Sequence, residues 1–215
     1  AFSIRAALLT PALYESKEHL LQTRQGLVQR IMSLRNSRDI QLTSLDEFVI
    51  SPTFYYVYQG YEDKELLSQL HAVYANAFPA IGTIDITHDR ALLPVVDNEK
   101  EHHLRIGFVS AHLRKHSMCK LFCGVISGLA KSSEMEVFVF SSLQENREDA
   151  YTRNLISTLG TTASDRRYHF IRVGKTVVHN RFEVINKNID VLVYLDVGMD
   201  PSTMIWASSR LAPVQ

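Results

Sequence analysis

The feature that most constrains the fold is a regular alternation of short apolar runs and helical patterns after residue 104. Four runs are mostly apolar: 104–110, 136–142, 168–173 and 190–195. Continuous apolar character is typical of strands that helices cover on both faces. Between these runs, apolar residues recur at helical spacing in 118–129, 151–159 and 178–185. The alternation predicts an α/β fold, a Rossmann-like doubly wound parallel sheet, with ligands at the carboxyl ends of its strands.

The first hundred residues have a different pattern, which predicts helices. Apolar residues recur at helical spacing in 11–35 and again in 62–78. The connector between them, SPTFYYVYQGYED, is too aromatic for a free linker, so we expect the segment from Phe54 to Tyr61 to be packed. Glu62 and Asp63 suit the positive end of the helix that follows.

A domain boundary is expected near residue 100, where turn residues and charges mix without a sustained period. We therefore expect a helical segment over 1–100 and an α/β lobe over 101–215. The chain begins without Met and stops at RLAPVQ, which suggests a piece of a longer protein. The helical part is compatible with the end of a helical-repeat array of the TPR kind.

Charge and composition narrow the function classes. The chain has 23 basic and 23 acidic side chains, so no overall field attracts nucleic acid or anionic lipid. It has neither a long apolar run nor a basic leader, so we expect no membrane partner and a cytoplasmic, possibly nuclear, location. Cys119 and Cys123 lie four residues apart on one predicted helix. We expect both to be small buried apolar groups, with no disulfide framework and no metal site.

The loop after the first predicted strand carries the first candidate functional residues. In LRIGFVSAHLRKHSMC the apolar run ends at Ser110, and His112, Arg114, Lys115 and His116 stand where a dinucleotide fold has a glycine-rich turn. Ser117 is expected to cap the next helix, whose amino terminus favours negative charge and a neutral imidazole at His116. His116 is then either a hydrogen-bond partner or proton acceptor, or only a surface histidine that caps the helix.

The fourth predicted strand leads into a second candidate loop, YLDVGMDPST. Asp196, Gly198 and Asp200 are expected to form a turn, with Asp200 as helix cap and Pro201 at the first helical position. Gly198 would allow a ligand close to the backbone, and Met199 lies beside it.

Several segments together resemble a known family. RIGFVSAHLRKHS, EVFVFSS and IDVLVYLDVGMDPSTMIWASSRLAPVQ, preceded by FYYVYQGYEDKELLSQLHAVY, resemble in order and spacing the catalytic region of the O-linked N-acetylglucosamine transferase family, including its bacterial and protist relatives. The resemblance implies the first lobe of a two-lobed GT-B glycosyltransferase. Such an enzyme moves N-acetylglucosamine from UDP-GlcNAc to Ser or Thr of intracellular proteins with inversion, without a metal or other cofactor.

The same resemblance implies site residues and partners. His116 matches the family's active-site histidine near the acceptor and the sugar. The other candidate substrate-binding residues are Ser110, His112, Ser117, Gly198, Met199 and Asp200. The expected partners are a protein or peptide acceptor and a UDP-sugar, which a second lobe beyond Gln215 would hold for the most part. The isolated chain is therefore expected to be inactive.

Three alternatives remain open. Asn186 stands near the position of a second active-site histidine of animal members, and VGMDP departs from the usual turn, so a relative that transfers fucose to Ser or Thr, or glucose to Asn, is possible. A stand-alone dinucleotide enzyme is disfavoured because the glycine fingerprint is missing. A non-catalytic interaction protein, which binds partners through its helical part, is the third.

Overall fold

The computed structural model describes residues 2–37, 39–43, 53–79, 103–160, 167–174 and 176–215. The chain divides into two compact units, Ala1–Thr83 and Ile84–Gln215. The predicted boundary near residue 100 lies outside the described residues, so it stays a prediction.

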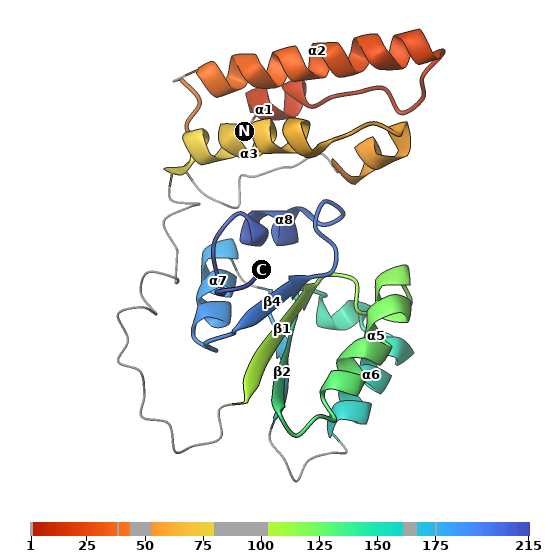
Figure 1. The fold of residues 1–215 in the computed structure, drawn as a ribbon, viewed down its shortest axis with the longest axis vertical. Coiled ribbons are helices and arrows are strands. Elements are labelled where there is room, and N and C mark those ends of the chain that lie inside the picture. The colour runs from red at the N-terminus through yellow and green to blue at the C-terminus, as the bar shows by residue number, and fades with distance from the viewer. Residues whose placement is uncertain (1, 38, 44–52, 80–102, 161–166, 175) are drawn as a thin grey trace. The chain divides into compact units, whose positions relative to one another are not determined.

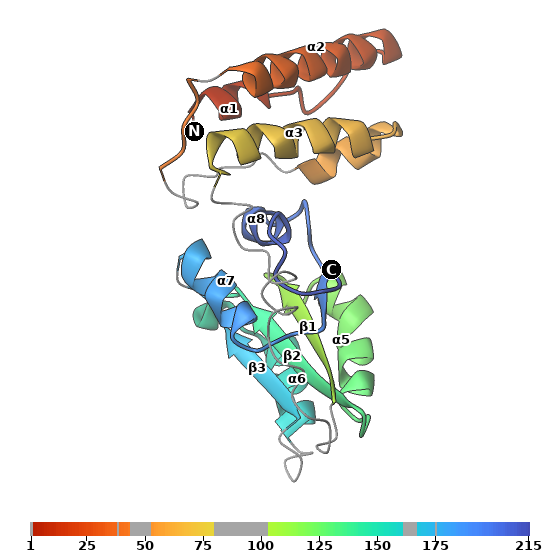
Figure 2. The ribbon, with the colours of Figure 1, turned by 60° about the vertical axis from the view of Figure 1, so that its left-hand side comes forward.

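The first unit is helical. Its elements are α1 (Phe2–Ala7), α2 (Lys17–Asn36), a 3-10 helix η2 (Thr53–Gln59) and α3 (Lys64–Ala77). Helices α2 and α3 lie side by side (Figures 1 and 2). Arg24 bonds to Asp63 at 2.7 Å, and the Asn76 amide donates to the Arg35 carbonyl at 3.2 Å. The first contact joins the early part of α2 to the start of α3, and the second joins the end of α2 to the end of α3. The two helices therefore run in the same direction.

The sequence predicted the two long helices but placed the start of α2 too early. Helix α2 begins at Lys17 rather than near residue 11, because the Ser16 hydroxyl accepts the His19 N–H and caps the helix there. Before α3, the Glu62 carboxylate accepts the Lys64 N–H at 2.9 Å, as its position suggested. The short helix α1 was not predicted.

The aromatic connector is less buried than predicted. It forms η2, in which Tyr56 is only 2% exposed. Tyr55 and Tyr58 are 64% and 73% exposed, so the prediction of a buried aromatic cluster is wrong for these two side chains. A 3-10 helix repeats every three residues, so only one side of this short segment faces inward.

The second unit contains a four-stranded sheet. Its strands are β1 (Leu104–Ser110), β2 (Met135–Ser141), β3 (Tyr168–Arg172) and β4 (Val191–Tyr194). Every neighbouring pair is parallel, and the order is β3-β2-β1-β4. Val214 bridges to Val191 on the outer side of β4, also in parallel. All four strands lie within one or two residues of their predicted limits.

Helices cover both faces of this sheet. They are α5 (Ser117–Leu129), α6 (Ala150–Gly160), α7 (Val177–Ile185) and α8 (Pro201–Ala207), with a 3-10 turn η4 (Glu145–Arg147) before α6. Helices α5 and α6 lie against one face and α7 against the other (Figures 1 and 2). The unit therefore has the predicted Rossmann-like, doubly wound fold, and the helical unit precedes it in the sequence.

The pleat of the strands divides the core into two layers. Ile106 and Phe108 of β1 pack with Ile126 of α5 and Leu155 of α6. Gly107 points to the opposite layer, where a Cβ at this position would lie within 3.2 Å of three side chains. Both layers are dry because β1 and β2 are buried from their third residue onward. Among the described helices, none is long and apolar enough to cross a membrane.

Candidate functional site

The strand order creates a switch point between β1 and β4. The chain runs outward from β1 to β2 and β3, and then returns to place β4 on the other side of β1. At such a point the loops that follow the two strands diverge, which opens a crevice at the carboxyl ends. All seven candidate residues that the sequence singled out lie in two segments at this point, one from the end of β1 to the start of α5 and the other in the turn between β4 and α8.

Asp196 joins the two loops. Its Oδ2 accepts the Ser110 hydroxyl at 3.0 Å and the Ala111 N–H at 2.7 Å. The Ser110 Oγ in turn accepts the His112 N–H at 2.9 Å. Asp196 is 1% exposed and Ser110 is 0% exposed, so this network lies inside the protein. Burial raises the pKa of Asp196, while the two donors and the nearby His112 oppose the rise.

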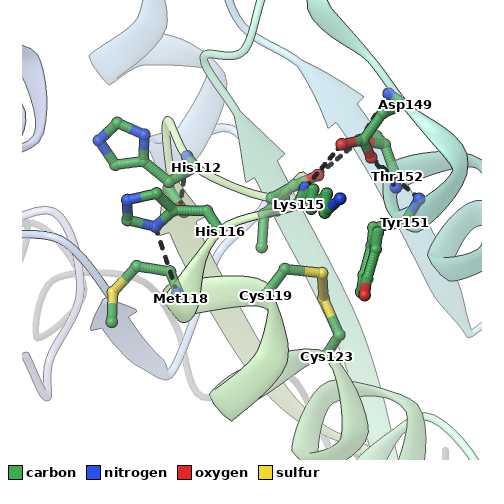
Figure 3. The surroundings of a disulfide bond; sticks show 11 residues. His112, Lys115, His116, Met118, Cys119, Cys123, Asp149, Tyr151 and Thr152 are labelled. Carbon is green, nitrogen blue, oxygen red and sulfur yellow. Dashed lines mark hydrogen bonds between the residues drawn. A yellow bond between two sulfur atoms is a disulfide. The ribbon is translucent and has the colours of Figure 1, made fainter.

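His116 occupies the cap of helix α5. Its Nδ1 accepts the Met118 N–H at 3.3 Å, as Figure 3 shows. The prediction that Ser117 caps this helix is therefore wrong: Ser117 is the first helical residue, and its side chain is exposed. The backbone of His116 is extended, as a cap position requires, whereas Ser117 already follows the helical path.

The imidazole of His116 stacks on that of His112. The ring centroids are 4.5 Å apart and the planes differ by 23° (Figure 3). Both side chains are half-buried. Since Nδ1 of His116 accepts a backbone N–H, the neutral ring carries its proton on Nε2. His116 thus presents an N–H donor and not a second lone pair.

The surroundings of His116 favour the neutral ring. Partial burial lowers the pKa of His116 first, the positive charges of His112 and Arg114 lower it further, and Asp196 opposes them. The sequence predicted this direction from the helix amino terminus alone. The structure gives burial as the leading cause, which the sequence pattern did not show.

The turn after β4 is built as predicted. Gly198 has a φ of 88°, a region that favours glycine. The Asp200 carboxylate accepts the N–H groups of Ser202 and Thr203 at 2.9 and 3.2 Å, and Pro201 begins α8. The Met199 N–H donates to the Asp196 carbonyl at 3.0 Å.

The histidine loop is also tied to the start of α6. Asp149 accepts the Lys115 N–H at 2.7 Å and the N–H groups of Tyr151 and Thr152 (Figure 3). These backbone donors, that of Lys115 first, lower the pKa of Asp149. The Thr152 hydroxyl donates to the Leu113 carbonyl at 2.6 Å. The loop is therefore held from both sides, by Asp149 and by Asp196.

The two cysteines depart from the sequence prediction. Cys119 and Cys123 form a disulfide within α5, one turn below the histidine pair (Figure 3). Cys119 is 3% exposed, as a small apolar group would be, but the expectation of two unpaired thiols is wrong. Two residues four apart on a helix share one face, which brings the sulfur atoms together.

The structure gathers most of the predicted site residues around one unpredicted group. Ser110, His112 and His116 belong to a single network of contacts. The N–H groups of Met199 and Asp200 both donate to the Asp196 carbonyl. Asp196 itself was expected only as a turn residue. The signal that could have marked it is a carboxylate directly after an apolar strand, at the edge where ligands bind.

Metal ligands and cavities in the described part of the chain define the other candidate sites. No group of three or more His, Cys, Asp or Glu side chains there could hold a metal ion. A cavity of about 550 Å³ lies in the helical unit, and Leu9, Tyr14 and Tyr58 are among its lining residues. Its lining is mostly apolar and aromatic and offers no acid–base pair.

Comparison with known proteins adds little to this picture. No protein-family model matches the sequence, and no characterised protein matches it either. Among solved structures, a mutant O-GlcNAc transferase of Thermobaculum terrenum aligns with a TM-score of 0.47 and 21% identity. The alignment covers 93% of this chain and 32% of that one, so this chain spans about a third of its length. The fold assignment rests on the strand order and helices of the chain itself.

Proposed function

We propose that the α/β unit is the first lobe of a GT-B glycosyltransferase that transfers N-acetylglucosamine from UDP-GlcNAc to Ser or Thr of proteins. The observation that carries the proposal is the stacked, half-buried pair of His112 and His116 at the switch point between β1 and β4. The order and spacing of the sequence segments that resemble the transferase family support the same reading.

The chemistry of an inverting transfer suits this edge. The hydroxyl oxygen of the acceptor bonds to C1 of the sugar while the bond from C1 to the diphosphate oxygen breaks, and the hydroxyl proton ends on an oxygen of the departing diphosphate. A neutral His116 with its proton on Nε2 would donate a hydrogen bond to an oxygen of the acceptor or the sugar. Loss of such a positioned donor typically costs about 10²–10³ in rate.

The remaining roles are divided between two lobes in this proposal. His112, Ser117, Gly198, Met199 and Asp200 lie in the segments that follow β1 and β4 and are assigned to substrate binding. Ser110, which is fully buried, acts through the network. The departing UDP is held by a second lobe outside this chain, with no metal ion and no cofactor. The 215-residue chain alone is therefore expected to show no turnover.

The test uses a longer protein that joins this chain to its second lobe. It is incubated with UDP-GlcNAc, UDP-glucose or GDP-fucose and a pool of peptides, and mass spectrometry identifies the added sugar and its attachment residue. We expect N-acetylhexosamine on Ser or Thr, and only from UDP-GlcNAc. Fucose on Ser or Thr, or glucose on Asn, would correct the donor and acceptor. Absence of transfer from every nucleotide sugar, together with binding of NAD, would overturn the proposal.

A further inference from the structure

The histidine pair depends on a buried acidic residue that the proposed chemistry does not use. Asp196 lies two residues after β4 and is 1% exposed. A buried carboxylate is costly unless donors compensate it, so its position needs a reason. Here both donors to its Oδ2 come from across the switch point, Ser110 from the last position of β1 and Ala111 from the loop that follows.

Those two bonds determine where the histidine loop leaves the sheet. The Ala111 N–H and the Ser110 hydroxyl point at Asp196, and the Ser110 oxygen then receives the His112 N–H. His112 in turn stacks on His116. A continuous chain of contacts thus runs from the end of β4 to the imidazole that caps α5.

The same carboxylate is the acidic group that acts on the His116 ring. Among the charged neighbours of His116, His112 and Arg114 lie on its own loop and disfavour a positive ring, whereas Asp196 across the switch point favours it. Asp196 itself is influenced by His112 and Asp200. Its Oδ1 and the Nδ1 of His112 are both buried and have no hydrogen-bond partner within the described ranges.

We propose that Asp196 is a positioning residue that sets the placement of the His112–His116 pair and the charge state of His116. It does so through two bonds that reach across the switch point and through its negative charge. This inference rests on the proposed function for its biological meaning, since the same histidines are used there. Its test needs no substrate, so the two can fail separately.

The experiment follows the imidazole signals of the 215-residue chain by NMR during a pH titration. Asp196→Asn keeps an oxygen that can accept both donors but removes the charge. The titration midpoint of His116 is expected to move to lower pH, because a negative neighbour that favoured the charged ring is gone. Ser110→Ala keeps the charge and breaks the link to His112, so the ring-current shifts of the stacked pair should be lost while the His116 midpoint moves less.

The control is Asp190→Asn at the other end of β4. Its carboxylate accepts the Arg105 N–H of β1 at 2.9 Å. Like the bonds of Asp196, this one joins the β4 segment to β1, but at the amino ends of the two strands. This variant should leave the His116 midpoint and the ring shifts unchanged. An unchanged midpoint in Asp196→Asn, or unchanged ring shifts in Ser110→Ala, would overturn the proposal. If Asp196→Asn did not fold, Ser110→Ala would decide it.

In the two-lobe protein, Asp196→Asn distinguishes a positioning role of Asp196 from a purely structural one. Protonation of His116 removes the Nδ1 lone pair that accepts the Met118 N–H and so releases the ring from the cap. Activity that needs the capped ring therefore falls as the pH drops through the pKa of His116. Asp196→Asn should therefore move the acid limb of the kcat profile to lower pH, in step with the NMR midpoint. A uniform loss of kcat at every pH would indicate a structural role only. Failure of transfer by the unsubstituted protein would count against the proposed function and leave the NMR result intact.

Discussion

A methyl group added at Gly107 should destabilise the α/β unit, whereas the same change at Gly124 should stabilise it. A Cβ at Gly107 would lie 2.7 Å from Leu192 Cδ1 and 3.2 Å from atoms of Ile189 and Phe140. Carbon atoms pack best at about 3.5–4.0 Å, so the nearest contact is too short by roughly 1 Å. Overpacking of this kind costs about 1–3 kcal/mol, and the lower backbone entropy of alanine returns about 0.5–1 kcal/mol. We expect Gly107→Ala to lose about 1–2 kcal/mol.

The matched control is Gly124→Ala on the exposed face of α5, where a Cβ would meet nothing within 4 Å. Alanine in a helix is favoured over glycine by about 0.5–1 kcal/mol, so this variant should gain stability. Urea unfolding is followed by the fluorescence of Trp206, which is the one tryptophan of the sequence and is fully buried in this unit. Equal or higher stability of Gly107→Ala would refute the packing of β1 described above.

A double variant locates the cause of the loss. Leu192→Val removes the Cδ1 atom that the new methyl group would strike. Combined with Gly107→Ala, it should cost less than the sum of the two single changes, by about 0.5 kcal/mol or more, as expected for residues in contact. If the two losses of stability simply add, the new methyl group does not clash with Leu192.

Three further outcomes are expected. Asp149→Asn should lower the free energy of unfolding near neutral pH, and the two proteins should become equally stable in acid. The lowered pKa of Asp149 stabilises the folded protein above the ordinary value of 3.8, and this stabilisation is lost as the pH falls through the folded-state pKa. Urea unfolding across pH will measure it. Asp200→Ala should lose about 1 kcal/mol in the same assay through the missing cap of α8, while Asp200→Ser should retain most of it. Thiol labelling of the unfolded, unreduced chain should find neither Cys119 nor Cys123 free, and both after reduction; two free thiols before reduction would contradict the disulfide.

Much of the α/β unit could be predicted from the sequence because its strands are buried on both faces. Such strands appear as uninterrupted apolar runs, and the runs at 104–110 and 168–173 coincide closely with β1 and β3. The cap at Asp200 was also predictable, since the acidic residue, Pro201 and the helix are adjacent in the sequence. Local sequence patterns thus identified the strands of this unit and the residue at which α8 begins.

The site was harder to predict because its central contacts are not local. Asp196 and Ser110 are 86 positions apart, and they meet only because β4 returns to the side of β1. No periodicity specifies that order. The exchange of Ser117 for His116 at the cap has a different origin: both side chains can accept a hydrogen bond, and the choice depends on where the backbone turns into the helix.

In the proposed function, His116 takes part in group transfer and does more than cap a helix. The most direct measurement is kcat of His116→Asn in the two-lobe protein at saturating donor and acceptor, with UDP affinity measured in parallel. Asparagine is a strong cap, so α5 should remain stable, which Trp206 fluorescence will check. We predict that kcat falls at least about a hundredfold while UDP affinity changes little, and that His112→Ala is much milder. Near-normal kcat in His116→Asn would contradict the account, because the histidine would then serve only as the cap.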